Sequence, residues 1–314
     1  MKIKLFVFKL LLFCSPLVLG WIVVEWKLAG IPNSYNQKRV YLERSLDSIQ
    51  VLVLGNSEAL YAINPSFFSY KGFNLANISQ SLYYDKRLAL KYIDQMPQLK
   101  LVVIPVSYTS FFHQLSDTKE NWRDYYYYRF WGIKYDELPI VDSKCFSYVS
   151  LYTMPEVLKM MKKGFKVNLA ANLYYNGFMK NDTLNSSKNI SDNSGKARVE
   201  LHDSSMVNER IPEIVNDLSG FLAELQKRKI QFVLITTPVY TTYSKYCNPL
   251  VLENNRKIID SLCRKFDCTY HSFFADNRFT AKDFADNDHM NFLGAERFSG
   301  ILNDEVIVPL FNAK

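Results

Sequence analysis

The chain has 314 residues, of which 38 are basic and 31 acidic, so its formal net charge is +7 at pH 7. A hydrophobic fraction of 48% with 22% charged residues excludes an intrinsically disordered chain. Only one segment is long and apolar enough to cross a bilayer, which excludes a membrane protein with several spans.

The apolar segment covers residues 5–24 and carries a single charge, Lys9. About 20 helical residues cross roughly 30 Å of hydrocarbon. Lys2, Lys4 and Lys9 precede the most apolar part, so the positive-inside rule predicts a cytoplasmic amino terminus and export of the rest of the chain.

We therefore expect residues 1–28 to form an uncleaved signal anchor that attaches the protein to a membrane; a cleaved signal peptide is the alternative. Residues 29–48 are polar and mixed in charge, and they are interpreted as a linker. The globular domain then spans residues 49–314.

Short apolar runs within this domain predict buried strands at residues 49–55, 99–106 and 230–238, with a weaker run at 269–274. Helical periodicity lies between and after them, at residues 84–96, 212–229, 250–266 and from about 294 onward. The alternation predicts an α/β fold, a three-layer arrangement with a mainly parallel central sheet covered on both faces.

Residues 109–210 interrupt this alternation and are interpreted as an insertion over the sheet edge. Its many aromatic residues either line a substrate cleft, contact a membrane surface or form a small core of their own. Residues 181–196 are strongly polar and are expected to be a mobile loop.

Four cysteines follow the anchor, and they fit either two disulfides or free thiols (Cys145, Cys247, Cys263, Cys268). They lack the paired spacing of a zinc site and no histidine cluster accompanies them, so no metal site is expected. The basic residues are scattered and belong to no nucleic-acid-binding motif, and a glycine-rich phosphate loop is absent. We therefore expect neither a nucleic-acid partner nor a nucleotide cofactor.

Candidate chemistry begins with Ser57, which follows Gly55 and Asn56 at the carboxyl end of the first predicted strand, where open α/β sheets bind ligands. A serine hydroxyl needs a base and a group that orients the base. His289 is the best candidate base, because it lies in a polar loop directly before the last helix. The other histidines lie in the insertion or within a predicted strand (His113, His202, His271).

Asp286, three residues before His289, can reach the imidazole Nδ1 through a turn. The adjacent Asp288 is the alternative carboxylate. Taken singly, Gly-x-Ser after a strand is often only a helix cap, and Asp-x-x-His is often a capped loop. Together, these blocks resemble the SGNH (GDSL-like) hydrolase family over residues 50–106 and 230–300. The resemblance implies that Ser57 is the nucleophile, His289 the base and Asp286 its orienting acid.

The middle blocks depart from the family pattern, in which a Gly and an Asn assist the backbone amide after the serine in binding the oxyanion. That amide belongs to Glu58 here, Ser79 stands at the Gly position, and Tyr108 or Ser107 lies nearest to the Asn position. The resemblance thus implies oxyanion or substrate-binding roles for Glu58, Ser79, Tyr108 and Asn77. Asn77 and Asn74 are nearby alternatives, although turn formation is the more ordinary explanation for each of them taken singly.

These departures are similar to membrane-anchored branches of the family, such as alginate O-acetylation proteins and the D-alanyl transfer protein of teichoic acids. They imply a serine esterase or O-acyltransferase that uses no cofactor and acts on acyl esters, such as acetyl esters, of a cell-envelope glycan. A membrane acyl-carrier partner and a catalytic domain exported to a bacterial periplasm or cell surface are implied as well. The alternative is an inactive carbohydrate-binding or assembly protein on a degenerate hydrolase fold.

Overall fold

The computed structural model describes residues 2–183 and 190–313. The chain folds into two compact units. We call them the helical unit, Met1–Gln37 with Asp124–Ala171, and the sheet unit, Lys38–Arg123 with Asn172–Lys314. The expected insertion at 109–210 is therefore divided between the two units.

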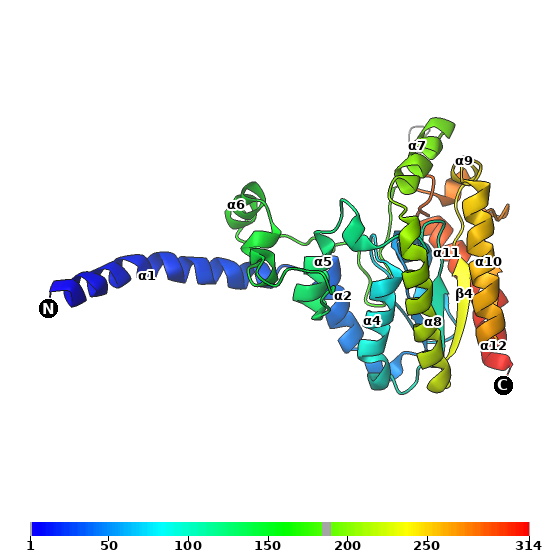
Figure 1. Cartoon of the computed structure of the whole chain (residues 1–314), viewed down its shortest axis with the longest axis horizontal. Helices are drawn as coiled ribbons and strands as arrows, with labels where there is room; N and C mark the ends of the chain where they lie inside the picture. Colours follow the sequence, from blue (N-terminus) through cyan, green and yellow to red (C-terminus); the bar gives the residue numbers. More distant parts are fainter. Residues whose placement is uncertain (1, 184–189, 314) are drawn as a thin grey trace. The chain divides into compact units, whose positions relative to one another are not determined.

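The sheet unit is built on five parallel strands, which confirms the predicted α/β class (Figure 1). Their order across the sheet is β2 (Gly72–Asn74), β1 (Val51–Val53), β3 (Leu101–Pro105), β4 (Gln231–Thr236) and β5 (Thr269–Ser272). Four of these strands lie in the predicted runs. The fifth, β2, was not predicted, because its three residues contain a single large apolar side chain, Phe73.

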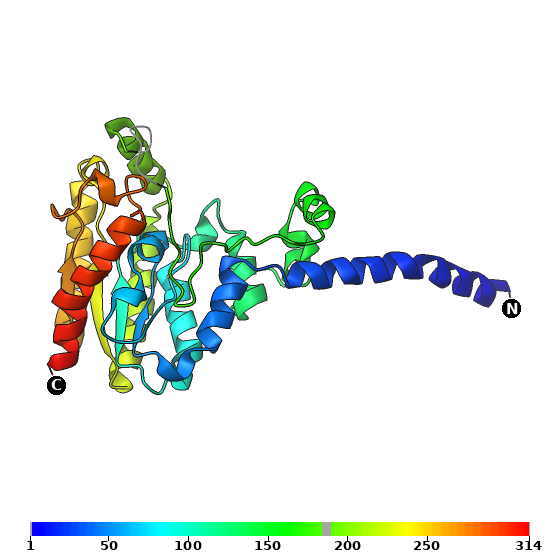
Figure 2. The ribbon, with the colours of Figure 1, turned by 180° about the vertical axis from the view of Figure 1, so that it is seen from behind.

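Helices cover both faces of this sheet, as predicted. One face carries α4 (Leu82–Tyr92), α8 (Ile211–Lys227) and α10 (Pro249–Phe266). The opposite face, seen in Figure 2, carries α3 (Ser57–Ala62), α11 (Phe292–Leu302) and, beyond it, α12 (Val308–Asn312). Alternate side chains of the central strands pack against Phe298 and Leu302 of α11, and these residues form a completely buried core.

The segment expected as a polar loop, residues 181–196, contains the beginning of a helix, α7 (Asp192–Asp203). Residues 184–189 of that segment lie outside the described residues. Helix α7 begins with a capping box between Ser191 and Ser194, and a Cβ at Gly195 would collide with the Thr242 carbonyl oxygen just inside α9 (Thr241–Ser244). Local capping and close tertiary packing therefore make a helix from a sequence that has little apolar periodicity.

The helical unit contains α1 (Lys2–Ala29) and α6 (Met154–Lys162), and the chain enters its second segment through α5 (Arg123–Tyr126). Helix α1 is long and apolar enough to span a membrane over Ile3–Ala29. The segment expected as a linker contains α2 (Ser34–Glu43), because the Asn33 side chain accepts hydrogen bonds from the first helical N–H groups.

Most aromatic side chains at residues 126–131 are buried within the helical unit. The ring of Tyr35 lies 5.1 Å from that of Tyr126 and 5.2 Å from that of Tyr127, and Phe130 and Trp131 are buried too. Of the three alternatives for these aromatics, a core of their own is the one observed. The five cysteines, all within the described residues, are free thiols.

Candidate active site

The turn after β1 presents Ser57 at the carboxyl end of the sheet. Gly55 has φ = +114°, and a Cβ there would lie 3.0 Å from Ala59 Cβ and 3.1 Å from a side-chain carbon of Pro105, so the turn requires glycine. The Gly55 N–H donates to the buried carboxylate of Asp85 at 2.9 Å. The side chain of Asn56 then caps α3, which places Ser57 at the first helical position.

The loop before α11 presents His289 by a similar set of local bonds. Asp286 Oδ1 accepts the N–H of His289 at 2.8 Å and that of Asp288 at 3.2 Å. The Ala285 N–H donates to the His289 carbonyl at 2.9 Å, and the Asn291 side chain caps α11. These hydrogen bonds fix the conformation of the loop and connect it to α11.

The structure brings Ser57, His289 and Asp286 together in one hydrogen-bonded chain. His289 Nε2 lies 2.9 Å from Ser57 Oγ, and His289 Nδ1 lies 2.9 Å from Asp286 Oδ2. The ring of Tyr61 packs edge-on against the imidazole at 5.4 Å. An imidazole held in this way can accept a hydroxyl proton on one nitrogen while a carboxylate stabilises the other N–H.

Asp288, the alternative carboxylate, lies on the opposite side of the imidazole. Its Oδ2 is 3.8 Å from His289 Nε2, and Arg198 binds both of its oxygens at 2.8–2.9 Å. The Asp288 side chain is buried, whereas Arg198 reaches it from the surface helix α7. The two neighbouring carboxylates thus have different positions, and Asp286 is the one in contact with Nδ1.

The charges around His289 favour its protonated form. Burial lowers the pKa of His289, but the negative charge of Asp288 and the hydrogen bond that the imidazole donates to Asp286 outweigh burial and raise that pKa to about 9. For Asp286, burial raises the pKa, but the hydrogen bond and positive charge of His289 outweigh burial and hold it well below its usual range. The site therefore stabilises the imidazolium that forms when His289 takes up a proton.

Ser79, at the position where a Gly was expected, keeps a backbone conformation that favours glycine. Its φ is +54°, in the left-handed region, and the residue lines the same cavity as Ser57. The Ser79 hydroxyl donates to Glu120, which also pairs with Arg123 Nε at 2.7 Å. His113 Nε2 lies 3.4 Å from the Ser79 carbonyl oxygen. These contacts hold a serine in a conformation that costs a non-glycine residue energy.

Glu58 lines the cavity, but its backbone N–H already donates a hydrogen bond within the chain. The Glu58 N–H donates to Asn56 Oδ1 at 3.0 Å, as part of the helix cap, and its carboxyl accepts from the Thr237 hydroxyl at 3.1 Å. Burial and the nearby charge of Asp288 raise the pKa of Glu58 to about 7. Among the described residues, the N–H groups of Ser57 and Ser79 donate to no other group of the chain.

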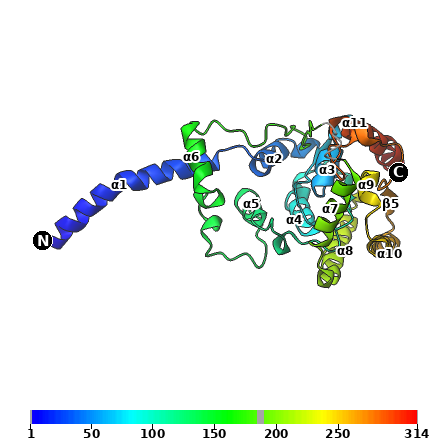
Figure 3. The same cartoon turned by 90° about the horizontal axis from the view of Figure 1, so that it is seen from above.

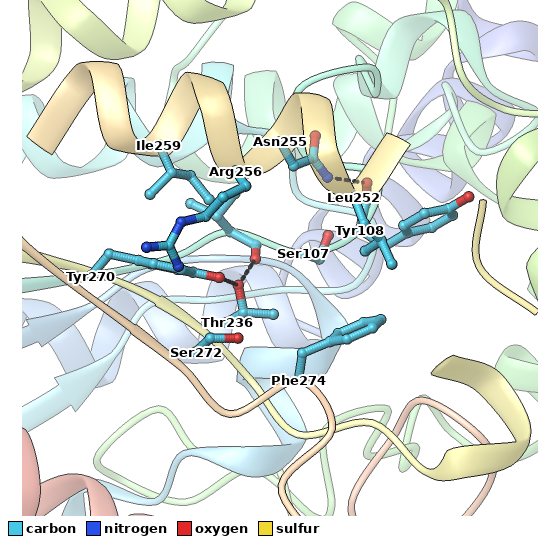
Figure 4. A pocket seen from close by; sticks show the side chains of 11 residues that line it. Ser107, Tyr108, Thr236, Leu252, Asn255, Arg256, Ile259, Tyr270, Ser272 and Phe274 are labelled. Atoms are coloured by element: carbon cyan, nitrogen blue, oxygen red, sulfur yellow. Dashed lines mark hydrogen bonds between the residues drawn. The ribbon is translucent and has the colours of Figure 1, made fainter. Parts of the chain in front are cut away.

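The structure does not bring Tyr108 to Ser57. The Tyr108 hydroxyl donates to Asp203 Oδ1 at 2.9 Å and accepts the Asn248 N–H at 3.0 Å. Tyr108 lines another cavity, of about 220 Å³, to which α10, β4 and β5 contribute. Figure 4 shows Tyr108 there, with its carbonyl accepting a hydrogen bond from Asn255. The expected role of Tyr108 is therefore wrong, because the chain turns its ring away from Ser57 after β3.

The remaining candidates connect the loops of the site. Asn77 is buried, its N–H donates to the Gly55 carbonyl at 3.1 Å, and its side chain accepts from the Ile78 N–H at 3.0 Å. The Asn74 side chain donates to carbonyls at the end of α3. Ser107 Oγ accepts from the Asn56 side chain at 3.1 Å. These residues shape the loops around Ser57.

A cavity of about 710 Å³ opens over Ser57 and His289. Most of the residues that line it are polar or charged, and Tyr61, Ile78 and Leu201 are among its apolar side chains. Helix α7 supplies part of the wall through Arg198 and His202, whose Nδ1 lies 2.5 Å from the Tyr243 hydroxyl. Burial lowers the pKa of His202 to about 4, so this imidazole is neutral at pH 7.

Sequence reasoning missed the roles of Arg198, His202 and Glu120 in this cavity. The spacing of four between Arg198 and His202 places both on one face of a helix, and that was the available signal. Nothing in the sequence pairs Glu120 with Ser79. Asp286, Asp288 and His289 have ligand atoms close enough for a metal ion, but the Arg198 guanidinium already supplies a positive charge at Asp288.

No family model matches the chain, and no curated protein matches it. Solved structures that the comparison matches to this chain include a Bacteroides fragilis protein provisionally described as an acylhydrolase, at 9% identity and a TM-score of 0.40, covering 87% of this chain and 96% of that one. Another is a Streptococcus pneumoniae protein provisionally described as a platelet activating factor, at 10% identity and a TM-score of 0.40, covering 94% and 98%. Likenesses this distant assign no activity to the chain.

Proposed function

We propose that this protein is a serine esterase or O-acyltransferase that acts on acyl esters through an acyl-enzyme on Ser57. The observation that carries the proposal is the continuous hydrogen-bonded chain from Ser57 Oγ through His289 to Asp286, with both distances at 2.9 Å. These three residues line a cavity large enough for a substrate.

In the first step, Ser57 Oγ attacks the ester carbonyl carbon while His289 Nε2 takes the hydroxyl proton. The tetrahedral intermediate collapses by breaking the bond to the alkoxy oxygen, which receives that proton from His289 and leaves as the alcohol. Water or a second hydroxyl then attacks the acyl group on Ser57 and gives its proton to His289. Collapse of this second intermediate returns the proton to Ser57.

The developing oxyanion needs hydrogen-bond donors, and the N–H groups of Ser57 and Ser79 are suited to this role. Both residues line the cavity. One oxyanion donor contributes about 3 kcal/mol to transition-state stabilisation. The left-handed conformation of Ser79 therefore supports an active enzyme over the degenerate-fold alternative, since it is the conformation that glycine would adopt there.

The many polar and charged side chains in the cavity support a substrate with polar groups, and we propose a cell-envelope glycan that carries acyl groups such as acetyl. Helix α1, which is long and apolar enough to span a membrane, would hold the enzyme at the membrane with the sheet unit exported to a bacterial periplasm or cell surface. Transfer, as opposed to hydrolysis, would use a membrane acyl-carrier partner as donor.

Labelling with a fluorophosphonate, followed by mapping of the modified residue, tests the proposal. We expect the label on Ser57, loss of labelling and of acetyl-ester hydrolysis in Ser57→Ala, and retention of both in Ser205→Ala, a matched serine of the same cavity. A folded wild-type protein that neither reacts with the probe nor cleaves esters would contradict the enzyme proposal and favour the carbohydrate-binding alternative.

A second measurement separates hydrolysis from transfer. The acyl-enzyme is formed from an activated acetyl ester in the presence of an acceptor oligosaccharide, and the products are identified by mass spectrometry. An acetylated oligosaccharide identifies a transferase, whereas free acetate alone identifies an esterase.

A further inference from the structure

Helix α6 of the helical unit exposes a row of apolar side chains. Met154, Leu158 and Met161 are 57%, 50% and 44% exposed, and their spacings of four and three residues place them along one side of the helix. Val157 and Met160, on the neighbouring side, are buried. The helical unit thus covers only part of the apolar surface of α6 and leaves the rest exposed.

Lysines border this exposed row. Lys159, Lys162, Lys163 and Lys166 are all exposed, and Glu156 is the one acidic residue between Met154 and Val167. Four lysines and one glutamate give this short segment a net charge of +3. A short amphipathic helix with a basic border is typical of segments that lie in the headgroup region of a bilayer.

The buried side of α6 packs on the carboxyl end of α1. Val157 and Met160 form one apolar cluster with Leu28 and Ile31, and Val24 packs against its margin. Figures 1 and 3 show α6 beside this end of α1. These contacts begin where the apolar segment at residues 5–24 ends, at the level where a helix that spans a bilayer would leave the hydrocarbon.

Further contacts fix residues 147 and 148 at the same level of α1. The Glu25 carboxylate accepts the N–H of Tyr148 at 2.7 Å and a hydrogen bond from the Ser147 hydroxyl. Trp26 and Phe146 line a hollow between these segments, and both are strongly exposed. Exposed aromatic rings at the end of an apolar helix are typical of a membrane–water interface.

We propose that α6 lies in the headgroup region of an anionic bilayer surface, with Met154, Leu158 and Met161 inserted and the lysines facing lipid phosphates. The inference rests on the proposed anchoring by α1. The end of α1 on which α6 packs exposes Trp26, and the positive charge of the α6 segment complements anionic lipid.

Photocrosslinking in the full-length protein tests this surface. A p-benzoylphenylalanine is introduced in place of Leu158, or in place of Leu250 of α10 as an exposed apolar control in the sheet unit. Each protein is reconstituted into vesicles of phosphatidylglycerol and phosphatidylethanolamine, or of phosphatidylcholine alone. We expect lipid adducts at position 158, more in the anionic vesicles, and none above background at position 250.

The lysines provide a second variant in which the apolar row is unchanged. Substituting Lys159, Lys162, Lys163 and Lys166 by Gln should reduce the adducts at position 158 in anionic vesicles to the level seen with phosphatidylcholine. High salt should do the same in the unsubstituted chain, because screening shortens the reach of surface charge. Equal adducts in both lipids before these changes would overturn the anionic preference.

Equal lipid adducts at positions 158 and 250 would overturn the proposal. Adducts with protein in place of lipid at position 158 would overturn it in favour of a protein partner. Flotation of the same vesicles reports anchoring by α1, and a chain that does not float removes the basis of the inference. Ester hydrolysis is measured on the same preparations. Lipid adducts on an inactive protein would contradict the proposed function and leave this surface intact.

Discussion

Asp288 and Asp286 flank the same imidazole, and their charges should have separable effects on the pH dependence of ester hydrolysis. General-base catalysis by His289 requires its neutral form, so activity should rise with pH and level off above the pKa of about 9. Asp288→Asn removes a negative charge 3.8 Å from Nε2 while leaving the contact between Asp286 and Nδ1 in place. The rising limb of the pH profile, the range over which activity increases with pH, should therefore move to lower pH.

The size of the shift follows from the distance. Two unit charges 3.8 Å apart interact by about 4 kcal/mol at an effective dielectric constant of about 20, and by about 1 kcal/mol in water. One pKa unit corresponds to about 1.4 kcal/mol, so Asp288→Asn should lower the pKa of His289 by about 1 to 3 units. Arg198, freed from its carboxylate, moves the pKa in the same direction because its positive charge disfavours the imidazolium.

The assay is kcat/KM for an acetyl ester between pH 6 and 10, with Arg198→Gln as the matched variant. Removing Arg198 leaves the Asp288 charge uncompensated, so the limb should move to higher pH in that protein. A limb that does not move in Asp288→Asn, or that moves upward, would refute the assignment of the raised pKa to Asp288.

Three further substitutions test the surrounding geometry. Asp286→Asn should lower kcat/KM by about 10³- to 10⁴-fold because the imidazole loses the negatively charged acceptor that fixes its tautomer, and a loss no larger than that of Asp288→Asn would show that Asp286 does not orient the base. Glu120→Gln should lower kcat by roughly tenfold by loosening the Ser79 backbone, a fraction of what one oxyanion donor contributes. The same change in a Ser79→Gly chain should have little effect, because glycine needs no support at positive φ. Equal losses in both chains would contradict this role of Glu120. Gly195→Ala should raise KM and move the pH limb upward, because the Cβ displaces α7 and Arg198 with it, and an unchanged profile would show that α7 does not hold Arg198 in place.

The parts of the fold that the sequence predicted are those with their own periodicity. The runs around β1, β3 and β4 are continuously apolar because both faces of these strands are buried, and α8 and α10 repeat apolar residues every three to four positions. Strand β2 and helix α7 lack such patterns. The former is stabilised by pairing with β1, and the latter by its cap and its contacts with Thr242 and Asp288.

The same distinction applies to the candidate site. Gly-x-Ser after a strand and Asp-x-x-His before a helix are local patterns, and the structure brings the residues of both together. Side-chain direction beyond the end of a strand is set by tertiary contacts. The prediction for Tyr108 failed for this reason, since Asp203 and Asn248, far along the chain, hold its hydroxyl away from Ser57.

Ser79 shows how a departure from a family pattern can be compatible with an intact site. Serine in place of glycine at an oxyanion position suggests a lost function only if the backbone conformation is lost with it. Here φ remains at +54°, and Glu120 and His113 contact Ser79 from the segment between β3 and β4. The energy that a side chain costs in this region is offset by these contacts. The aromatic-rich insertion thus supplies, through its first residues, a support that the local sequence around Ser79 lacks, and the substitution and the insertion are best understood as one compensating pair.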